Sequence, residues 1–232
     1  MSRIRLTRIP WTFAFLLIFS FAPSTSPAER GVEVTWSGPT DVPRVAVTFD
    51  DGPDPRWTPR VLDILSYADA HATFFVLGER VEGNEKILKR MLDEGHEIGS
   101  HGFHHHAFTK LSSQQRILEI SMAGDAIEKG CGVPPVLFRP PGGSISFSVL
   151  RDLSRTDVEL VVMWSIDPKD WMKPGERKIW ERIGREVEPG SIILLHDTHR
   201  STVEALPVLL DLLQARGFDL VTVSDLLERN YR

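Results

Sequence analysis

Two adjacent aspartates, Asp50 and Asp51, follow an apolar stretch in the segment Val-Thr-Phe-Asp-Asp-Gly-Pro. Adjacent side chains of an extended chain point to opposite sides, so two neighbouring carboxylates at the end of a strand can take different tasks. A carboxylate can accept a proton as a general base or bind a divalent cation. Gly52 and Pro53 then force a tight turn. A turn with two solvated acids is the alternative that this motif alone leaves open.

A histidine-rich segment, His-Gly-Phe-His-His-His, occupies residues 101–106. His101 and His105 are four residues apart, so both imidazoles could reach one ion if the segment turned helically. Two histidines and one carboxylate leave one coordination position of zinc open, which is typical of catalytic zinc sites. The pattern does not decide which of His104, His105 and His106 would bind, and a solvent-exposed histidine loop is the alternative.

Two further ionisable groups end apolar stretches. Arg139 precedes the rigid sequence Pro-Pro-Gly-Gly, and a guanidinium can orient a carboxylate through two hydrogen bonds. A surface ion pair is the alternative for a single arginine. His196 stands before Asp197 at the end of an apolar run. An imidazole at that place could act as a general acid, or it could be an ordinary buried and hydrogen-bonded histidine.

Carboxylates and tryptophans alternate in the segment Trp-Ser-Ile-Asp-Pro-Lys-Asp-Trp at residues 164–171. Asp167 and Asp170 are its acids. The large apolar faces of Trp164 and Trp171 could form a platform for sugar rings, or both rings could belong to the core.

The elements that position these groups follow from the hydrophobic periodicity. Seven apolar runs are predicted as buried strands, at residues 45–49, 73–77, 97–100, 136–139, 158–165, 192–196 and 218–223. Helices are predicted at residues 60–68, 84–94, 113–129, 176–187 and 203–215, with Gly95, Gly130 and Gly217 ending three of them. Alternation of this kind predicts a parallel sheet covered by helices. The polar motifs then meet at the carboxyl-terminal edge of the sheet, where such proteins build their sites.

The five motifs, in this order, resemble those of the polysaccharide deacetylase family, also called the NodB-homology family or carbohydrate esterase family four. The resemblance extends from about residue 44 to residue 226. It implies a distorted, incomplete (β/α) barrel with about seven parallel strands. That fold agrees with the length of the chain, which is shorter than the roughly 250 residues of a complete eight-stranded barrel.

The resemblance also implies roles for the ionisable residues. Asp50 is the expected catalytic base and Arg139 the residue that holds it. His196 is the expected general acid, and Asp170 is expected to adjust its proton affinity. The activity implied is the removal of acetyl groups from N-acetylglucosamine units in peptidoglycan, chitin or a related oligosaccharide, so the expected partner is an N-acetylated glycan.

The implied metal ligands are Asp51, His101 and His105, and zinc is the divalent ion expected for this set. The resemblance places three further residues at the substrate: Trp171 and Leu195 at the acetyl pocket and the Gly142 N–H at the oxyanion.

Two glycines depart from the family pattern. Gly102 stands where a serine or threonine is usual, and Gly142 stands where an aromatic residue is usual. The first removes a hydroxyl from the histidine motif, and the second removes one wall of the substrate groove.

Residues 1–28 read as a secretory signal peptide. Three arginines lie in the first eight residues, an uncharged apolar run covers residues 11–22, and Ser26 and Ala28 are the small residues of a cleavage site. The apolar run is shorter than the roughly 20 residues of a membrane-spanning helix. An uncleaved anchor, which would give membrane contact, and a buried core helix are the alternatives. Residues 29–43 are predicted as a short lead-in and residues 44–232 as the catalytic domain of an exported protein.

The composition argues against other kinds of protein. The 232 residues carry 27 Lys+Arg against 32 Asp+Glu, which argues against a nucleic-acid partner because such a partner requires a basic face. A single cysteine cannot form an internal disulfide. A monomer is the default expectation.

Two other classes of protein remain as alternatives. A carbohydrate-binding protein on a degenerate deacetylase scaffold would have lost one of the motif residues, and none is lost. A glycosidase would use two carboxylates opposed across a cleft, whereas Asp50 and Asp51 are adjacent.

Overall fold

The computed structural model describes residues 31–229. The predicted signal segment at residues 1–28 lies outside them. Among residues 31–229, no helix is long and apolar enough to cross a bilayer.

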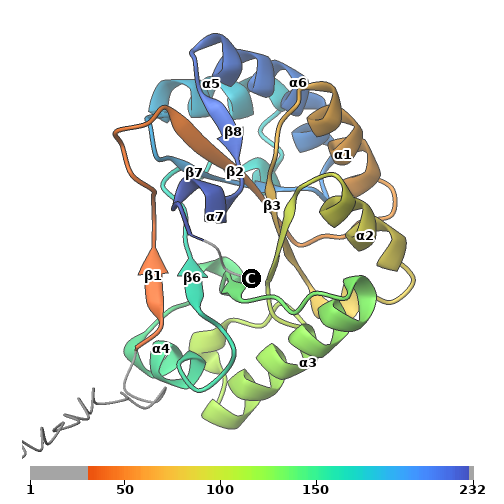
Figure 1. Ribbon diagram of the computed structural model, residues 1–232, viewed down its shortest axis with the longest axis vertical. Coiled ribbons are helices and arrows are strands. Elements are labelled where there is room, and N and C mark those ends of the chain that lie inside the picture. The colour runs from red at the N-terminus through yellow and green to blue at the C-terminus, as the bar shows by residue number, and fades with distance from the viewer. Residues whose placement is uncertain (1–30, 230–232) are drawn as a thin grey trace, which may run out of the picture.

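One parallel sheet organises the described part of the chain (Figure 1). Its strand order is β1-β6-β5-β4-β3-β2-β7, and β8 also pairs with β2. The strands are β1 Glu33–Thr35, β2 Arg44–Asp50, β3 Thr73–Val76, β4 Glu97–Ser100, β5 Leu137–Phe138, β6 Leu160–Val162, β7 Ile192–His196 and β8 Asp219–Val221.

The sheet curls into an incomplete barrel. Strand β6 does not pair with β7. The segment after β6 reaches β7 through an isolated backbone bridge between Ile166 and Ile193. The Leu194 N–H donates to the Ile166 carbonyl at 2.9 Å across this junction. All seven predicted strands are present, so the prediction of a distorted, incomplete barrel of parallel strands is confirmed.

Strand β1 is an addition that the sequence analysis did not predict. It lies inside the predicted lead-in at residues 29–43 and pairs in parallel with β6, from Glu33 beside Leu160 to Thr35 beside Val162. Glu33 is exposed and Val34 and Thr35 are only partly buried, so no continuous apolar run marks this strand. The segment before residue 44 therefore includes an edge strand of the sheet.

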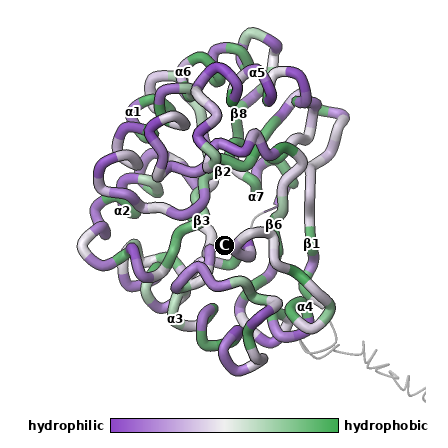
Figure 2. The backbone as a smooth tube through the Cα atoms, turned by 180° about the vertical axis from the view of Figure 1, so that it is seen from behind, coloured by the Kyte–Doolittle hydropathy of each residue, from purple (hydrophilic) through white to green (hydrophobic). Residues whose placement is uncertain are grey.

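Helices surround the sheet on its outer side (Figures 1 and 2). In Figure 2 the central strands β2 and β3 are mostly hydrophobic, whereas hydrophilic residues recur along the surrounding helices. The α-helices are α1 Thr58–Tyr67, α2 Glu85–Asp93, α3 Ser113–Cys131, α4 Phe147–Leu153, α5 Glu176–Glu186, α6 Arg200–Ala215 and α7 Val223–Leu226. Helices α4 and α7, which have seven and four residues, were not predicted. Such short helices give too little periodicity to detect.

Helix α3 ends later than predicted. It continues through Gly130 to Cys131, and Gly132 adopts the left-handed conformation of a helix terminus, with φ +86°. The Gly132 N–H donates to the Glu128 carbonyl at 2.7 Å. A Cβ at Gly130 would lie 2.6 Å from Val81 Cγ1, so Gly130 serves close packing instead of termination.

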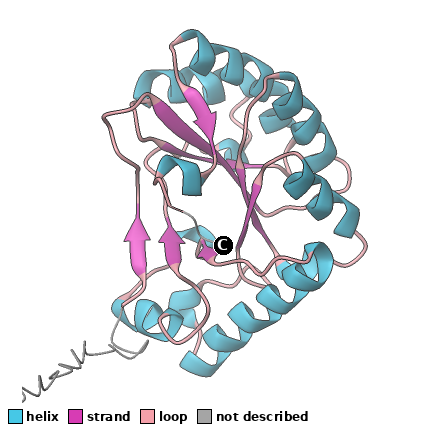
Figure 3. Ribbon diagram, in the orientation of Figure 1, coloured by secondary structure: helices cyan, strands magenta, loops and turns pink. Residues whose placement is uncertain are grey.

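Alternate residues of each strand face different layers. In β2, Val45, Val47 and Phe49 belong to the core between the sheet and the helices. Ala46 faces the interior of the barrel, together with Phe75 and Leu137. Figure 3 shows the strands of the sheet with helices around them. This alternation decides which strand residues can reach the site at the rim.

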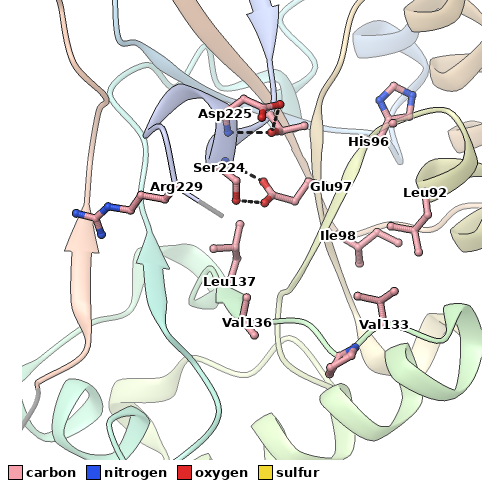
Figure 4. Close-up of a pocket in the computed structure, with 13 residues that line it drawn as sticks. Leu92, His96, Glu97, Ile98, Val133, Val136, Leu137, Ser224, Asp225 and Arg229 are labelled. Carbon is pink, nitrogen blue, oxygen red and sulfur yellow. Dashed lines mark hydrogen bonds between the residues drawn. The ribbon is translucent and has the colours of Figure 1, made fainter. Parts of the chain in front are cut away.

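The amino-terminal end of the barrel is covered by α7. Val223 and Leu226 of this helix pack against the interior residues Ala46 and Leu137. Figure 4 shows the pocket beside α7, where Glu97 accepts hydrogen bonds from Ser224. Glu97 also accepts a 2.8 Å hydrogen bond from the Thr73 hydroxyl. Its polar groups are therefore engaged in holding α7 against the sheet, at the end opposite the ionisable motifs.

Candidate active site

The ionisable motifs meet at the carboxyl-terminal rim of the barrel, as predicted. The pocket there takes its lining from the ends of β2, β4 and β7 and from the loops after β5 and β6. Its lining residues are Asp50, Asp51, His101, His105, Gly142, Trp164, Asp167, Trp171, Leu194 and His196.

Asp51, His101 and His105 form a cluster whose possible ligand atoms all lie within 4.8 Å of one another. Asp51 Oδ1 is 3.3 Å from His105 Nε2 and 3.6 Å from His101 Nε2. The structure thereby selects His105 from the three candidates at residues 104–106. It brings together the three side chains that the family resemblance implies as metal ligands.

The local chemistry of this cluster fits a divalent metal ion. Asp51 Oδ1 is buried and has no hydrogen-bond partner among the described residues, so its lone pairs are available. His101 Nδ1 lies 2.7 Å from the Arg139 carbonyl, which places the proton on Nδ1 and leaves Nε2 free to bind an ion. Burial lowers the pKa of His101 to about 3, so this imidazole is neutral, as a metal ligand must be.

The backbone that carries this cluster is left-handed at three places. Asp51 has φ +72°, Gly102 has φ +82° and His105 has φ +59°. Residues 101–105 do not form a helical turn, which was the condition under which the spacing would bring the imidazoles together, and the two imidazoles converge through this irregular loop instead. A left-handed conformation is unfavourable for non-glycine residues, and such residues concentrate at functional sites.

The two adjacent carboxylates also differ from the prediction. They do not point to opposite sides, because Asp51 is left-handed instead of extended. Asp50 Oδ2 lies 3.7 Å from His101 Nε2, which is close to the separation between that nitrogen and Asp51 Oδ1. Both acids therefore face one pocket.

Asp50 is held by a completely buried arginine. Arg139 Nη1 donates to Asp50 Oδ1 at 2.8 Å and to the Thr48 hydroxyl at 2.7 Å. The remaining guanidinium donors reach the backbone carbonyls of Val162 and Met163, both at 3.0 Å. Burial raises the pKa of Asp50, although the positive charge of Arg139 opposes that rise. The carboxylate is thus fixed in position and more basic than an exposed aspartate.

His196 is oriented from the other side of the pocket. Its Nδ1 lies 2.7 Å from Asp170 Oδ1, and its backbone N–H donates to Asp170 Oδ2 at 2.8 Å. The Thr202 hydroxyl donates to the same Oδ2 at 2.6 Å. Burial alone would lower the pKa of His196, but the hydrogen bond to Asp170 and its charge raise it to about 9. The imidazole is therefore positively charged at neutral pH.

Leu195 does not line the pocket, and this prediction was wrong. Leu195 packs in the core between sheet and helices, whereas Leu194 lines the pocket. Side chains alternate along β7, so the residue on the same face as His196 is two positions before it.

Gly142 and Trp171 do lie at the pocket, as predicted. The Trp171 side chain is half exposed there, in agreement with a platform rather than a core residue. A Cβ at Gly142 would have no atom within 4 Å, so the missing wall of the groove is open space in the protein. The backbone at Gly142 has φ +61°, which glycine adopts without strain.

Asp197 packs against the turn that follows Asp51. A Cβ at Gly52 would lie 2.4 Å from Asp197 Oδ2, so only glycine allows this approach. The Thr58 hydroxyl of α1 donates to the same oxygen at 2.5 Å. Burial raises the pKa of Asp197 to about 7. The turn after Asp51 is therefore packed tightly against the residue that follows His196.

Leu194, Thr48 and Thr202 are site residues that were not predicted. Strand alternation counted back from His196 would have identified Leu194. Thr48 is two residues before Asp50 on the same face of β2, so the same rule applies. Thr202 lies on α6, and nothing local in the sequence indicates that it donates to Asp170.

Comparisons with known proteins agree with this geometry. Residues 37–161 match the family model for polysaccharide deacetylases. A peptidoglycan-N-acetylglucosamine deacetylase of Bacillus cereus is 40% identical over 198 residues, which cover 84% of this chain and 92% of that protein. A peptidoglycan-N-acetylmuramic acid deacetylase of Bacillus subtilis is 41% identical over 184 residues, 79% of this chain but 38% of that longer protein.

A solved structure shows the same fold. The crystal structure of a peptidoglycan N-acetylglucosamine deacetylase superimposes with a TM-score of 0.81 at 32% sequence identity. The match covers 85% of this chain and 94% of that one. With the family model matching more than half of the chain, these findings show that the chain belongs to the polysaccharide deacetylase family.

Proposed function

We propose that this protein is a metal-dependent deacetylase that hydrolyses the N-acetyl amide of N-acetylglucosamine units in an exported glycan, either peptidoglycan or a chitin-like oligosaccharide. One observation carries the proposal. A fixed, buried carboxylate, a cluster of metal-ligating side chains and a charged imidazole line the same pocket. Metal-assisted hydrolysis of an amide uses these three elements together, as the base, the Lewis acid and the general acid.

The cluster of Asp51, His101 and His105 would hold the divalent ion, with zinc as the preferred ion for two imidazoles and one carboxylate. When bound, the ion supplies polarisation of the acetyl carbonyl and a lower pKa for attacking water.

Asp50 is the proposed general base. Its carboxylate is fixed by Arg139 and its pKa is raised by burial, which brings its basicity closer to that required for accepting a proton from water. The backbone N–H of Gly142, at the rim of the pocket, is the proposed donor to the negative oxygen that develops on the acetyl group.

His196 is the proposed general acid. An amine is a poor leaving group until its nitrogen is protonated. Asp170 holds Nδ1 of His196, so Nε2 can present its proton to the pocket. Trp171 would offer its half-exposed ring to a sugar.

The experiment that tests this function is acetate release. The metal-loaded protein is incubated with peptidoglycan and, separately, with N-acetylated chitooligosaccharides, and free acetate is measured. We expect acetate from at least one of these substrates, and analysis of the product sugars would tell whether glucosamine or muramic acid units lost the acetyl group. Absence of acetate from both, with metal bound, would refute the proposed function.

The pH dependence provides a second test. The acid form of His196 is the working form, so kcat should fall as pH rises through its pKa of about 9. Asp170 raises that pKa, and therefore Asp170→Asn should move the alkaline limb of the kcat profile to lower pH. The measurement is kcat against pH for both proteins at saturating substrate. An alkaline limb that stays in place in the variant would assign it to another group.

A further inference from the structure

A second cluster of metal-ligating side chains lies on the other side of the histidine-rich segment. His104 and His106, which flank His105, are turned towards Glu119 of α3 instead of towards Asp51. Possible ligand atoms of His104, His106 and Glu119 all lie within 4.8 Å of one another. The proposed deacetylation uses none of these three residues.

The Glu119 carboxylate is held in place by hydrogen bonds, as is usual for a metal ligand. Its side chain is buried, and its Oε2 accepts the backbone N–H groups of Phe103 at 3.0 Å and His104 at 2.9 Å. Its Oε1 faces the two imidazoles, with His104 Nδ1 at 2.7 Å and His106 Nδ1 at 3.4 Å. One carboxylate oxygen is thus held by the backbone while the other points to the nitrogens. This is how ligating carboxylates are commonly oriented.

We propose that His104, His106 and Glu119 hold a second divalent transition-metal ion, separate from the ion of the Asp51, His101 and His105 cluster. Zinc bonds to nitrogen and oxygen are about 2.0–2.2 Å long, so donor atoms around a tetrahedral ion lie about 3.3–3.5 Å apart. The separation of 3.4 Å between His106 Nδ1 and Glu119 Oε1 has this size. At His104 the ion replaces the hydrogen-bonding proton, so the 2.7 Å separation lengthens on binding.

The donor set determines the class of ion. Two imidazoles and one carboxylate suit zinc, copper or nickel, whereas magnesium and calcium require mainly oxygen ligands. The imidazoles are partly exposed, at 42% for His104 and 56% for His106, so an ion can enter and water can complete its coordination.

The position of this second site gives it a structural task. Glu119 belongs to α3, whereas His104 and His106 belong to the loop that carries His101 and His105. An ion bound there would tie the ligand loop to a long helix. Because the loop has a left-handed backbone at Gly102 and His105, a conformation that its own local preferences do not favour for His105, this tether would help to hold it in place.

Zinc stoichiometry tests the proposal. The full chain, freed of metal, is titrated with Zn²⁺ by calorimetry, and bound zinc is measured after dialysis. The variants are the double substitution His104→Gln with His106→Gln, the single substitution Asp51→Asn, and their combination. His71→Gln is the matched control, because His71 is an exposed histidine that belongs to neither cluster. Circular dichroism checks that each protein is folded.

We expect two zinc ions per chain in the wild type and in His71→Gln, one in the double histidine variant, one in Asp51→Asn and none in the combination. A wild type that binds one ion, or a double histidine variant that still binds two, would overturn the second site. If Asp51→Asn keeps both ions, that result contradicts the metal site at Asp51, His101 and His105, which belongs to the proposed function.

Discussion

Replacing Asp50 by Asn is expected to lower kcat/KM for acetate release by about 10²–10⁴-fold, the usual contribution of a positioned general base. The amide has nearly the same shape as the carboxylate, and its oxygen can still accept the 2.8 Å hydrogen bond from Arg139. It cannot accept a proton from water. The metal ligands are unchanged, so metal content should stay at the wild-type level.

Asp51→Asn is the matched control for this experiment, because it changes the neighbouring carboxylate in the same way. Asp51 Oδ1 faces both imidazoles of the cluster, so this variant should lose metal as well as activity. Activity and bound metal are measured together on both variants. If Asp50→Asn keeps wild-type kcat/KM, Asp50 is not the base, and if it loses its metal, the division of tasks between the two acids is wrong.

Replacing Arg139 by Met is expected to lower the free energy of unfolding by about 3–5 kcal/mol, the usual cost of leaving one member of a buried ion pair without its partner. Arg139 is completely buried, and its loss leaves the Asp50 carboxylate without its counter-charge. The carbonyls of Val162 and Met163 also lose their donors. The measurement is urea denaturation followed by circular dichroism.

Two further variants separate stability from catalysis. Arg116→Met breaks another buried ion pair, to Asp152 at 2.8 Å, between α3 and α4. It should also destabilise the protein, but kcat of the folded fraction should remain. Adding Asp50→Asn to Arg139→Met removes the uncompensated charge, so it should recover part of the lost stability. An Arg139→Met protein with wild-type stability would contradict the assignment of this pair.

The parts of the fold that could be predicted are those with long apolar runs. Strands β2 and β7 have seven and five residues, almost all buried, and both were predicted within one residue at each end. Strand β1 has three residues, none of them fully buried, and its place in the sheet depends on pairing with β6, which is distant in the sequence. Such long-range pairing leaves no local pattern.

The residues of the candidate site likewise include some that could be predicted and some that could not. Residues that follow strands, such as Asp50, His101 and His196, were predicted because parallel strands deliver their ends to one rim. The contacts of Glu119 and Thr202 come from helices, whose rotation against the sheet is set by packing. Spacing alone could not distinguish His105 from His104 and His106, and only the family motif pointed to His105. The left-handed backbone that turns His105 towards Asp51 is not encoded in spacing.

The helix that closes the amino-terminal end determines the side from which the pocket can be reached. Between α7 and the guanidinium of Arg139 the interior is filled by apolar side chains, among them Phe75 and Leu137. The pocket therefore does not continue through the barrel towards α7. Glycan, water and both products enter and leave at the carboxyl-terminal rim, where the missing wall at Gly142 leaves the pocket open on one side.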